Sequence, residues 1–178
     1  NLRALIGVDP PRAQVMLDHM IRYLRATLSG SRATSHPLAA EFARLEDYLA
    51  LMAIRMGPRL RSTLELPEAL RDVPVPPLLL QPLVENAIRH GLEPQVDGGH
   101  ITVRAMRDGA GIVLEVADTG AGFDPSAPAP TGGSRFGLAQ VRERVATAYE
   151  GRGHVALTST PGRGTVIRLH LPAPQREA

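Results

Sequence analysis

The chain of 178 residues contains no cysteine and no lysine, and only 3% of its residues are aromatic. The absence of cysteine excludes disulfides, thiolate metal ligands and a cysteine nucleophile. All 20 basic residues are arginine, so a P-loop and pyridoxal chemistry, which both need a lysine, are excluded as well. With so few aromatic residues, aliphatic side chains must build the core.

Long apolar runs and a strong excess of charge are also missing. No run approaches the about 20 apolar residues that span a bilayer, and we expect no signal peptide in the chain. The net charge of +2 is small. Interleaved charges and scarce stacking aromatics predict that the protein does not bind nucleic acid.

Residues 1–57 are expected to form a dimerisation unit, a helical hairpin. Apolar residues with helical spacing predict a helix over 11–29, with two prolines at its start, where proline is tolerated. A second helix over 37–56 carries an apolar stripe whose steps alternate between four and three, as in a coiled-coil seam. The stripe consists of Leu38, Phe42, Leu45, Leu49, Met52 and Met56. This seam predicts a second copy in a four-helix bundle, and the alternative is that it packs on the domain that follows.

Residues 58–178 have the pattern of a mixed α/β domain. Strands are predicted over 60–66, 101–107, 112–117, 155–159 and 165–171. A proline cluster at 74–77 opens a helix that carries Asn86, and Gly137 starts a helix that runs to about Tyr149. The run from 125 to 134, rich in proline and glycine, is predicted to be a loop.

The segment QPLVENAIRHG, from Gln81 to Gly91, is the first candidate for ligand chemistry. Magnesium prefers oxygen and is usually held by one or two protein oxygens, waters and substrate phosphates, so the Asn86 carbonyl is a suitable ligand. Arg89 and His90, three and four residues on, share that helix face and could reach phosphates. The alternative is a solvated helix end, in which Glu85 and Arg89 form an ordinary ion pair.

Asp118 ends an apolar strand and is followed by Gly120 and Gly122. Burying a carboxylate there costs free energy unless a hydrogen-bond donor lies beside it, and an ionised carboxylate only accepts hydrogen bonds. It therefore suits the exocyclic amine of adenine, while the glycines let the backbone approach the base. A simple β-turn is the alternative.

Two further glycine segments follow. Gly137 and Leu138 open a helix, whose N-terminus offers free amides and a positive dipole end to phosphates. The glycine-rich loop before it could fold over a nucleotide as a lid. The run Gly162-Arg163-Gly164-Thr165 is a tight turn, most simply a hairpin.

In this order, QPLVENAIRHG, DTGAG, FGLAQVRERV and GRGT resemble the ATP-binding domain of the GHKL superfamily, and the first and third are similar to LytS-type sensor histidine kinases. The segment YLALMAIRMGPRL in the hairpin matches the dimerisation region of these kinases. The resemblance implies an α+β chain whose second part is a Bergerat fold, an α/β sandwich with helices on one face of a mixed sheet. It also implies ATP and Mg²⁺ as ligands and a lid loop at about 123–136.

The resemblance further implies a role for each site residue. Asn86 would bind magnesium, Arg89 would take the usual lysine position near the phosphates, and His90 would flank the nucleotide. Asp118 would read the adenine amine. The ATP-binding set is completed by Gly120 and Gly122 at the pocket floor, by Phe136, Gly137 and Leu138 at the phosphate end, and by Thr165 near Asp118.

The function implied is that of a protein-histidine kinase core, which passes the γ-phosphate of ATP to a histidine and then to an aspartate of a response regulator. The family's acceptor histidine lies in a segment similar to NPHFLFN, so we expect it upstream of Asn1 and expect no acceptor within this chain. His19 and His36 are outside that context and are expected to be surface or loop histidines. The resemblance also implies an inner-membrane sensor, with this portion in the cytoplasm.

Two alternatives remain. A hydrolase of the same superfamily carries a water-activating glutamate four residues before the magnesium asparagine. Here that position is Pro82, and the neighbouring Glu85 points about 100° away around the helix. The other alternative is a degenerate, non-catalytic nucleotide-sensing dimerisation module, because Arg135 replaces the glycine that the family usually has two positions before Gly137.

Overall fold

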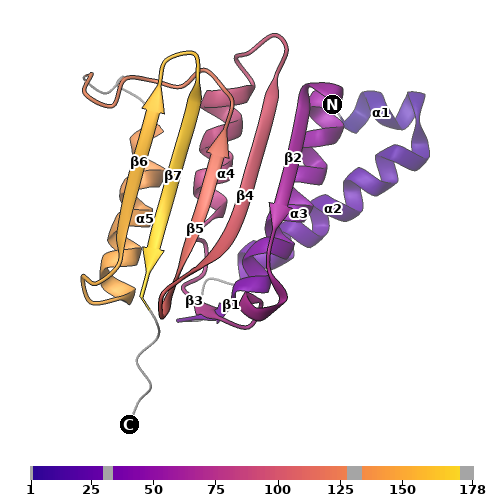
Figure 1. The fold of residues 1–178 in the computed structure, drawn as a ribbon. Helices are drawn as coiled ribbons and strands as arrows, with labels where there is room; N and C mark the ends of the chain where they lie inside the picture. The colour runs from indigo at the N-terminus through magenta and orange to yellow at the C-terminus, as the bar shows by residue number, and fades with distance from the viewer. Residues whose placement is uncertain (1, 30–33, 128–133, 173–178) are drawn as a thin grey trace.

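The computed structural model describes residues 2–29, 34–127 and 134–172, and these form an α+β fold around one five-stranded sheet (Figure 1). The order across the sheet is β2 (Leu60–Glu65), β4 (Gly99–Asp108), β5 (Gly111–Asp118), β7 (Gly164–Leu171) and β6 (His154–Thr160). Strands β2 and β4 are parallel to each other, and all other neighbouring strands of this sheet are antiparallel. The fold class and all five predicted strands are confirmed.

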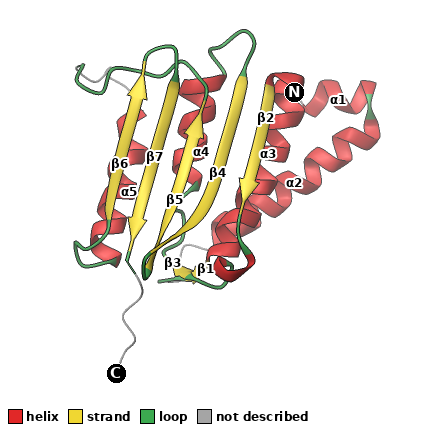
Figure 2. Cartoon of the chain, viewed as in Figure 1, coloured by secondary structure: helices red, strands yellow, loops and turns green. Residues whose placement is uncertain are grey.

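Three helices, α3 (Leu38–Met56), α4 (Gln81–Asn86) and α5 (Ser134–Ala148), lie on one face of the sheet. Within the part of the chain that the structure describes, no helix covers the other face (Figure 2). Helices α1 (Leu2–Val8) and α2 (Pro10–Ser29) extend away beside α3, and α2 packs on α3 as a hairpin.

Short elements complete the chain. Strands β1 (His36–Pro37) and β3 (Pro74–Val75) pair antiparallel next to the start of α3. Two 3₁₀ turns, η2 (Gly57–Arg59) and η3 (Glu68–Leu70), flank β2. Helix α4 continues into a π-helical turn, η4 (Ala87–Leu92).

The core lies between the helices and the covered face of the sheet. Strand β4 alternates buried and half-buried residues from Gly99 to Met106, as expected for a strand with one face in the core. Strand β5 is buried on both faces from Ile112 to Val116: on the open face Val113 is 7% exposed, and Glu115 is enclosed by two arginines. Arg104 and Arg168 from the neighbouring strands bond to its carboxylate at 2.7 and 2.6 Å.

The apolar stripe of α3 is part of this same core. Leu38 and Leu45 have no exposed surface, and they belong to one cluster with Leu83 and Val84 of α4. The prediction that a second copy covers the stripe is therefore wrong, and the alternative, packing on the following domain, is correct. The division of the chain at residues 57 and 58 stays a prediction, since α3 shares its core with the sheet.

Helix α2 has a different apolar face that the described part of the chain leaves open. Leu17, Ile21 and Leu24, spaced by four and three, are 43%, 39% and 51% exposed. Its other side faces α3, where His19 bonds to Asp47 at 2.9 Å. Among the described residues, no helix has the length and apolar character needed to cross a membrane.

Three local predictions need correction. Helix α5 begins at Ser134, three residues before Gly137, so Gly137 lies inside its first turn. The proline cluster forms β3 and a turn, and α4 begins only at Gln81. His19 and His36 are only partly exposed, with side chains 20% and 13% exposed, and each pairs with a carboxylate.

Candidate functional site

Asp118 stands at the last position of β5 and is 8% exposed. The backbone N–H of Gly120 donates to its Oδ1 at 2.8 Å, and its register partner on β7 is Thr165. Burial raises the pKa of Asp118, although the amides of Gly120 and Thr165 oppose that rise. The site thus holds a buried carboxylate whose charge is supported by backbone donors and which can still accept a hydrogen bond.

The segment from Gln81 to Gly91 meets the Asp118 turn at two glycines. A Cβ on Gly91 would lie 2.8 Å from Oδ1 of Asp118, and one on Gly120 would lie 2.3 Å from the backbone of Gly91. The N–H of Ala121 donates to the carbonyl oxygen of Gly91 at 2.9 Å. Backbone contact therefore requires glycine at 120, whereas a Cβ at 91 would displace the carboxylate of Asp118, and both contacts bring the end of η4 against Asp118.

Gly122 closes the other side of this turn. It has a φ of 56°, and a Cβ there would lie 2.0 Å from the carbonyl oxygen of Thr160. The N–H of Gly162 donates to the carbonyl oxygen of Ala121 at 2.7 Å. The turn between β6 and β7 is therefore bound to the Asp118 turn, which places Thr165 beside the carboxylate.

Asn86 is the last residue of α4 and faces the first turn of α5. A Cβ on Gly137 would lie 2.7 Å from Nδ2 of Asn86. The side chain of Leu138 is 9% exposed and packs in the core, which leaves its backbone for any contact with a ligand. An asparagine oxygen that stands beside a helix N-terminal turn suits a magnesium ion shared with phosphates.

Arg89 and His90 both lie in the π-helical turn η4. Its wider ring, closed by the bond from the N–H of Glu93 to the carbonyl oxygen of Ile88 at 2.8 Å, rotates the residues relative to an α-helix. Arg89 lines a polar cavity of about 220 Å³ with Glu85, next to α3. The α-helical spacing that predicted a shared face does not apply within η4, so the position of Arg89 and His90 on the face of Asn86 stays a prediction.

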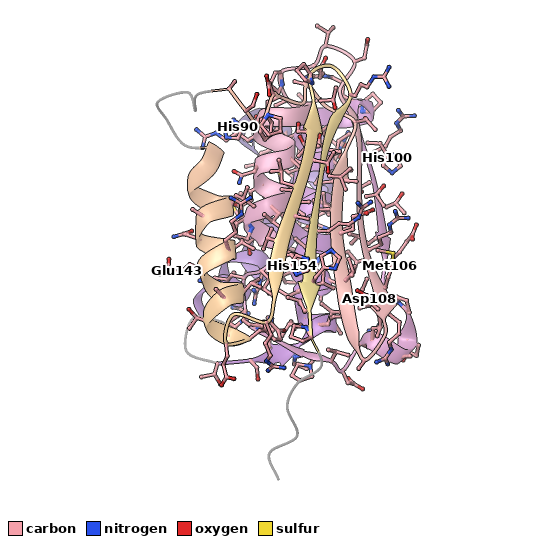
Figure 3. The ribbon with its side chains drawn as sticks, turned by 60° about the vertical axis from the view of Figure 1, so that its left-hand side comes forward. His90, His100, Met106, Asp108, Glu143 and His154 are labelled. Atoms are coloured by element: carbon pink, nitrogen blue, oxygen red, sulfur yellow. The ribbon has the colours of Figure 1, made fainter. Side chains whose placement is uncertain are left out.

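His90 is exposed and lies at the end of the molecule where α5 begins (Figure 3). Partial burial and the neighbouring charge of Arg89 lower the pKa of His90. A neutral imidazole at this end can accept or donate one hydrogen bond to a ligand.

Most of the predicted lid loop, at about 123–136, and part of the phosphate end of the site lie outside the residues that the structure describes. Residues 123–127 are exposed, whereas 128–133 and the side chains of Arg135 and Phe136 lie outside the described part of the chain. Among the described residues, no group of three or more histidines, aspartates and glutamates is arranged to hold a metal ion.

Sequence reasoning missed three residues that shape the site. Gly91 closes the site against Asp118 and is the last residue of a motif that was recognised, so the signal was present. Glu41 and Arg144 bind the turn before α4 from two sides. No local pattern marks them, because their partners lie 37 and 67 residues away along the chain.

Comparison with known protein families agrees with this geometry. Residues 76–175 match the family of histidine kinase-, DNA gyrase B-, and HSP90-like ATPases. The chain belongs to this family. Residues 1–60 match a second family, described as histidine kinase. The two matches together span both the hairpin and the domain that holds the site.

Relatives of this family member are sensor kinases of the LytS type. The chain is 28% identical to the sensor protein LytS of Bacillus subtilis (strain 168), over 98% of this chain and 31% of LytS. It is 30% identical to the sensor histidine kinase YpdA of Escherichia coli (strain K12), over 94% of this chain and 30% of YpdA. The chain thus spans about a third of the length of these relatives.

Solved structures support the fold. The histidine kinase domain of the blue-light activated kinase from Erythrobacter litoralis EL346 aligns with a TM-score of 0.59, at 17% identity, over 96% of this chain and 80% of that domain. The histidine kinase AdeS of Acinetobacter baumannii aligns with a TM-score of 0.58, at 16% identity, over 92% of this chain and 81% of AdeS.

Proposed function

We propose that this chain binds ATP with Mg²⁺ and acts as the catalytic core of a sensor histidine kinase. The adenine amine would donate to the carboxylate of Asp118, and the carbonyl oxygen of Asn86 would be a ligand of magnesium. The bound ion would neutralise phosphate charge when ATP is in place. The observation that carries the proposal is the meeting of Asp118, Gly91 and Gly120 in one buried contact, with Asn86 facing Gly137 on the same side.

The remaining site residues take supporting roles in the proposal. Gly120 and Gly122 form the floor at the adenine side, with Thr165 beside the carboxylate. Phe136, Gly137 and Leu138 would approach the phosphates from the start of α5. Arg89 and His90, both exposed, would approach the phosphates or flank the nucleotide from η4.

The whole protein would transfer the γ-phosphate to a histidine and then to an aspartate of a response regulator. Such a transfer depends mainly on positioning and on neutralising charge along the line of displacement. The relatives, named as sensor histidine kinases, support this partner. We further propose that this portion lies in the cytoplasm as part of an inner-membrane sensor, and that it does not bind nucleic acid.

Homodimerisation would use α2 rather than the α3 stripe. Leu17, Ile21 and Leu24 form an exposed apolar row on the outside of the hairpin. Burial of such a row against a second copy stabilises association by about 25 cal/mol per Å² of apolar area. A bundle formed on this face is compatible with an α3 stripe that packs in its own domain.

Calorimetric titration of Mg²⁺–ATP into the chain and into Asp118→Asn tests the proposal. We expect binding in the native chain and a loss of about tenfold or more in the variant, because a hydrogen bond to a charged group contributes about 1.5–3 kcal/mol. The absence of binding to the native chain would contradict the proposal. That result would shift support to a degenerate module, an alternative that the kinase relatives do not favour.

A further inference from the structure

The turn at residues 77–80, which leads into α4, is anchored on α3 by one carboxylate. Glu41 accepts the backbone N–H groups of Leu78, Leu79 and Leu80 at 2.8, 2.9 and 2.9 Å. A carboxylate that accepts three amides from consecutive residues fixes the path of that segment, because each bond constrains a different peptide plane.

Glu41 is itself held as an ion within the core. Its side chain is 1% exposed, and its Oε1 lies 2.9 Å from Nε2 of His36 and 3.2 Å from Nη1 of Arg44. Burial would raise the pKa of Glu41, but the hydrogen bonds from His36 and from the amides of Leu80 and Leu78 hold it below its ordinary value. The anchor is therefore charged at neutral pH, which strengthens its hydrogen bonds.

The same turn is anchored on α5 by a guanidinium. Nη1 of Arg144 donates to the carbonyl oxygens of Pro77 and Leu78 at 2.6 and 3.1 Å. Leu78 has a φ of 61°, in a region that leucine rarely adopts. Backbone of this kind persists only where the surroundings over-determine it, and here Glu41 and Arg144 do so from opposite sides.

Helix α4 connects this turn to Asn86 in the candidate site. The carbonyl oxygen of Leu80 accepts the N–H groups of Leu83 and Val84, which ties the turn to the first turn of the helix. The helix has six residues, so about 9 Å separates the turn from Asn86. Helix α5 thus holds this segment at two points, through Arg144 at the turn before α4 and through the contact of Gly137 with Asn86 at the end of α4.

We propose that Glu41 is a positioning residue for the magnesium–nucleotide site, and that it fixes Asn86 relative to Gly137 by holding the 77–80 turn between α3 and α5. The inference rests on the proposed function, since it takes Asn86 as the ligand of magnesium. Glu41 lies at the opposite end of α4 from Asn86, so it acts through the turn and the helix.

The test compares ATP binding with Mg²⁺ and with EDTA in its place, in the full 178-residue chain. Glu41→Gln removes the charge and one acceptor oxygen, and Glu46→Gln makes the same change at an exposed position of α3. We expect the tightening of ATP binding by magnesium to fall about tenfold in Glu41→Gln, as for other residues that position metal ligands. The affinity of Glu41→Gln for ATP in EDTA should equal that of the native chain. The affinities of Glu46→Gln for ATP, with Mg²⁺ and with EDTA, should also equal those of the native chain.

A folded Glu41→Gln chain with the native response to magnesium overturns the inference. A merely structural role would lower the melting temperature without changing the ratio of the two affinities. If circular dichroism shows that Glu41→Gln does not fold, Arg144→Met decides, because it frees the same turn while the Glu41 cluster stays intact. We expect the same loss of magnesium response, and a native response in folded Arg144→Met overturns the inference.

Failure of the proposed function gives a different result. In that case the native chain does not bind ATP, or Asn86→Ala leaves the response to magnesium unchanged. Either outcome also removes the inference, and each is recognised without the Glu41 variant.

Discussion

The carboxylate of Asp118 lies in a buried position that makes its charge costly for folding. Because burial raises its pKa, the stability that this group contributes is fully present below its ordinary pKa of 3.8 and is lost as pH rises through the raised value. At neutral pH the ionised group therefore opposes folding. Asp118→Asn is then a clean test of binding, since we do not expect it to lower stability.

Gly91 lets the prediction for the adenine side be tested without changing a charge. In Gly91→Ala the new Cβ would lie 2.8 Å from Oδ1 of Asp118, so the carboxylate must shift. We expect ATP affinity to fall about tenfold or more, because the bond to the charged group is misplaced. Calorimetry on the folded variant measures this.

Gly7→Ala is the matched control for that prediction. Gly7 lies in α1, and a Cβ there meets nothing within 4 Å. Its affinity for ATP should equal that of the native chain. Equal affinities in both variants would show that the Asp118 carboxylate does not contact the nucleotide.

Predictability from sequence differs among the residues of the site. Asp118 and Asn86 could be found because each sits in a short motif whose chemistry is local. Glu41 could not be found, since a single glutamate within a helix is typical of a solvated face. Only the fold shows that its partners, 37 to 39 residues later, turn back onto α3.

At the scale of the element, the charge of Glu41 on α3 holds the turn that leads into α4. The lowered pKa of Glu41 means that its stabilisation is present above the ordinary value of 4.5 and is lost as pH falls through the lowered one. Glu41→Gln should lower the free energy of unfolding at pH 7 by about 3 kcal/mol, since a buried charge pair is broken. The difference from the native chain should shrink as pH falls below 4.5.

Urea denaturation across this pH range measures the difference, with Glu46→Gln as the control that should follow the native curve. A constant difference between Glu41→Gln and the native chain at every pH would mean that Glu41 is not ionised in the fold.

The elements were predictable wherever periodicity alone decided them. All five strands of the sheet and both long hairpin helices lie where the pattern placed them. The start of α5 was not predictable, because the proline- and glycine-rich sequence before it hides where the helix begins. The π-helical turn η4 was not predictable either, because no local rule specifies hydrogen bonds between residues five apart. The partner of the α3 stripe also could not be read from its spacing, since the same pattern serves a coiled coil and a core helix.

At the scale of the whole molecule, the outer face of α2 predicts self-association. Ile21→Glu places a charge in the middle of the exposed row with Leu17 and Leu24. We expect the native chain to sediment as a dimer at tens of micromolar. The dissociation constant of the variant dimer should be about tenfold higher or more, because one buried charge without a partner costs several kcal/mol.

Arg22→Glu is unsuitable as a control for this prediction, because Arg22 pairs with Asp47. Val96→Glu is suitable, since Val96 is 86% exposed and lies in the loop between η4 and β4. A native chain that sediments as a monomer at the same concentration would contradict dimerisation through α2.

The central place of β5 determines the order in which the backbone opens to solvent. It pairs with β4 from Gly111 to Asp118 and with β7 from Ile112 to Asp118, whereas β2 and β6 each have a neighbour on one side. Amide protons exchange with deuterium only when their local structure opens, so the edge strands should lose protection first and β5 last. Asp118 is the final residue of β5, which means that the group proposed to hold the base sits on the most persistent part of the backbone.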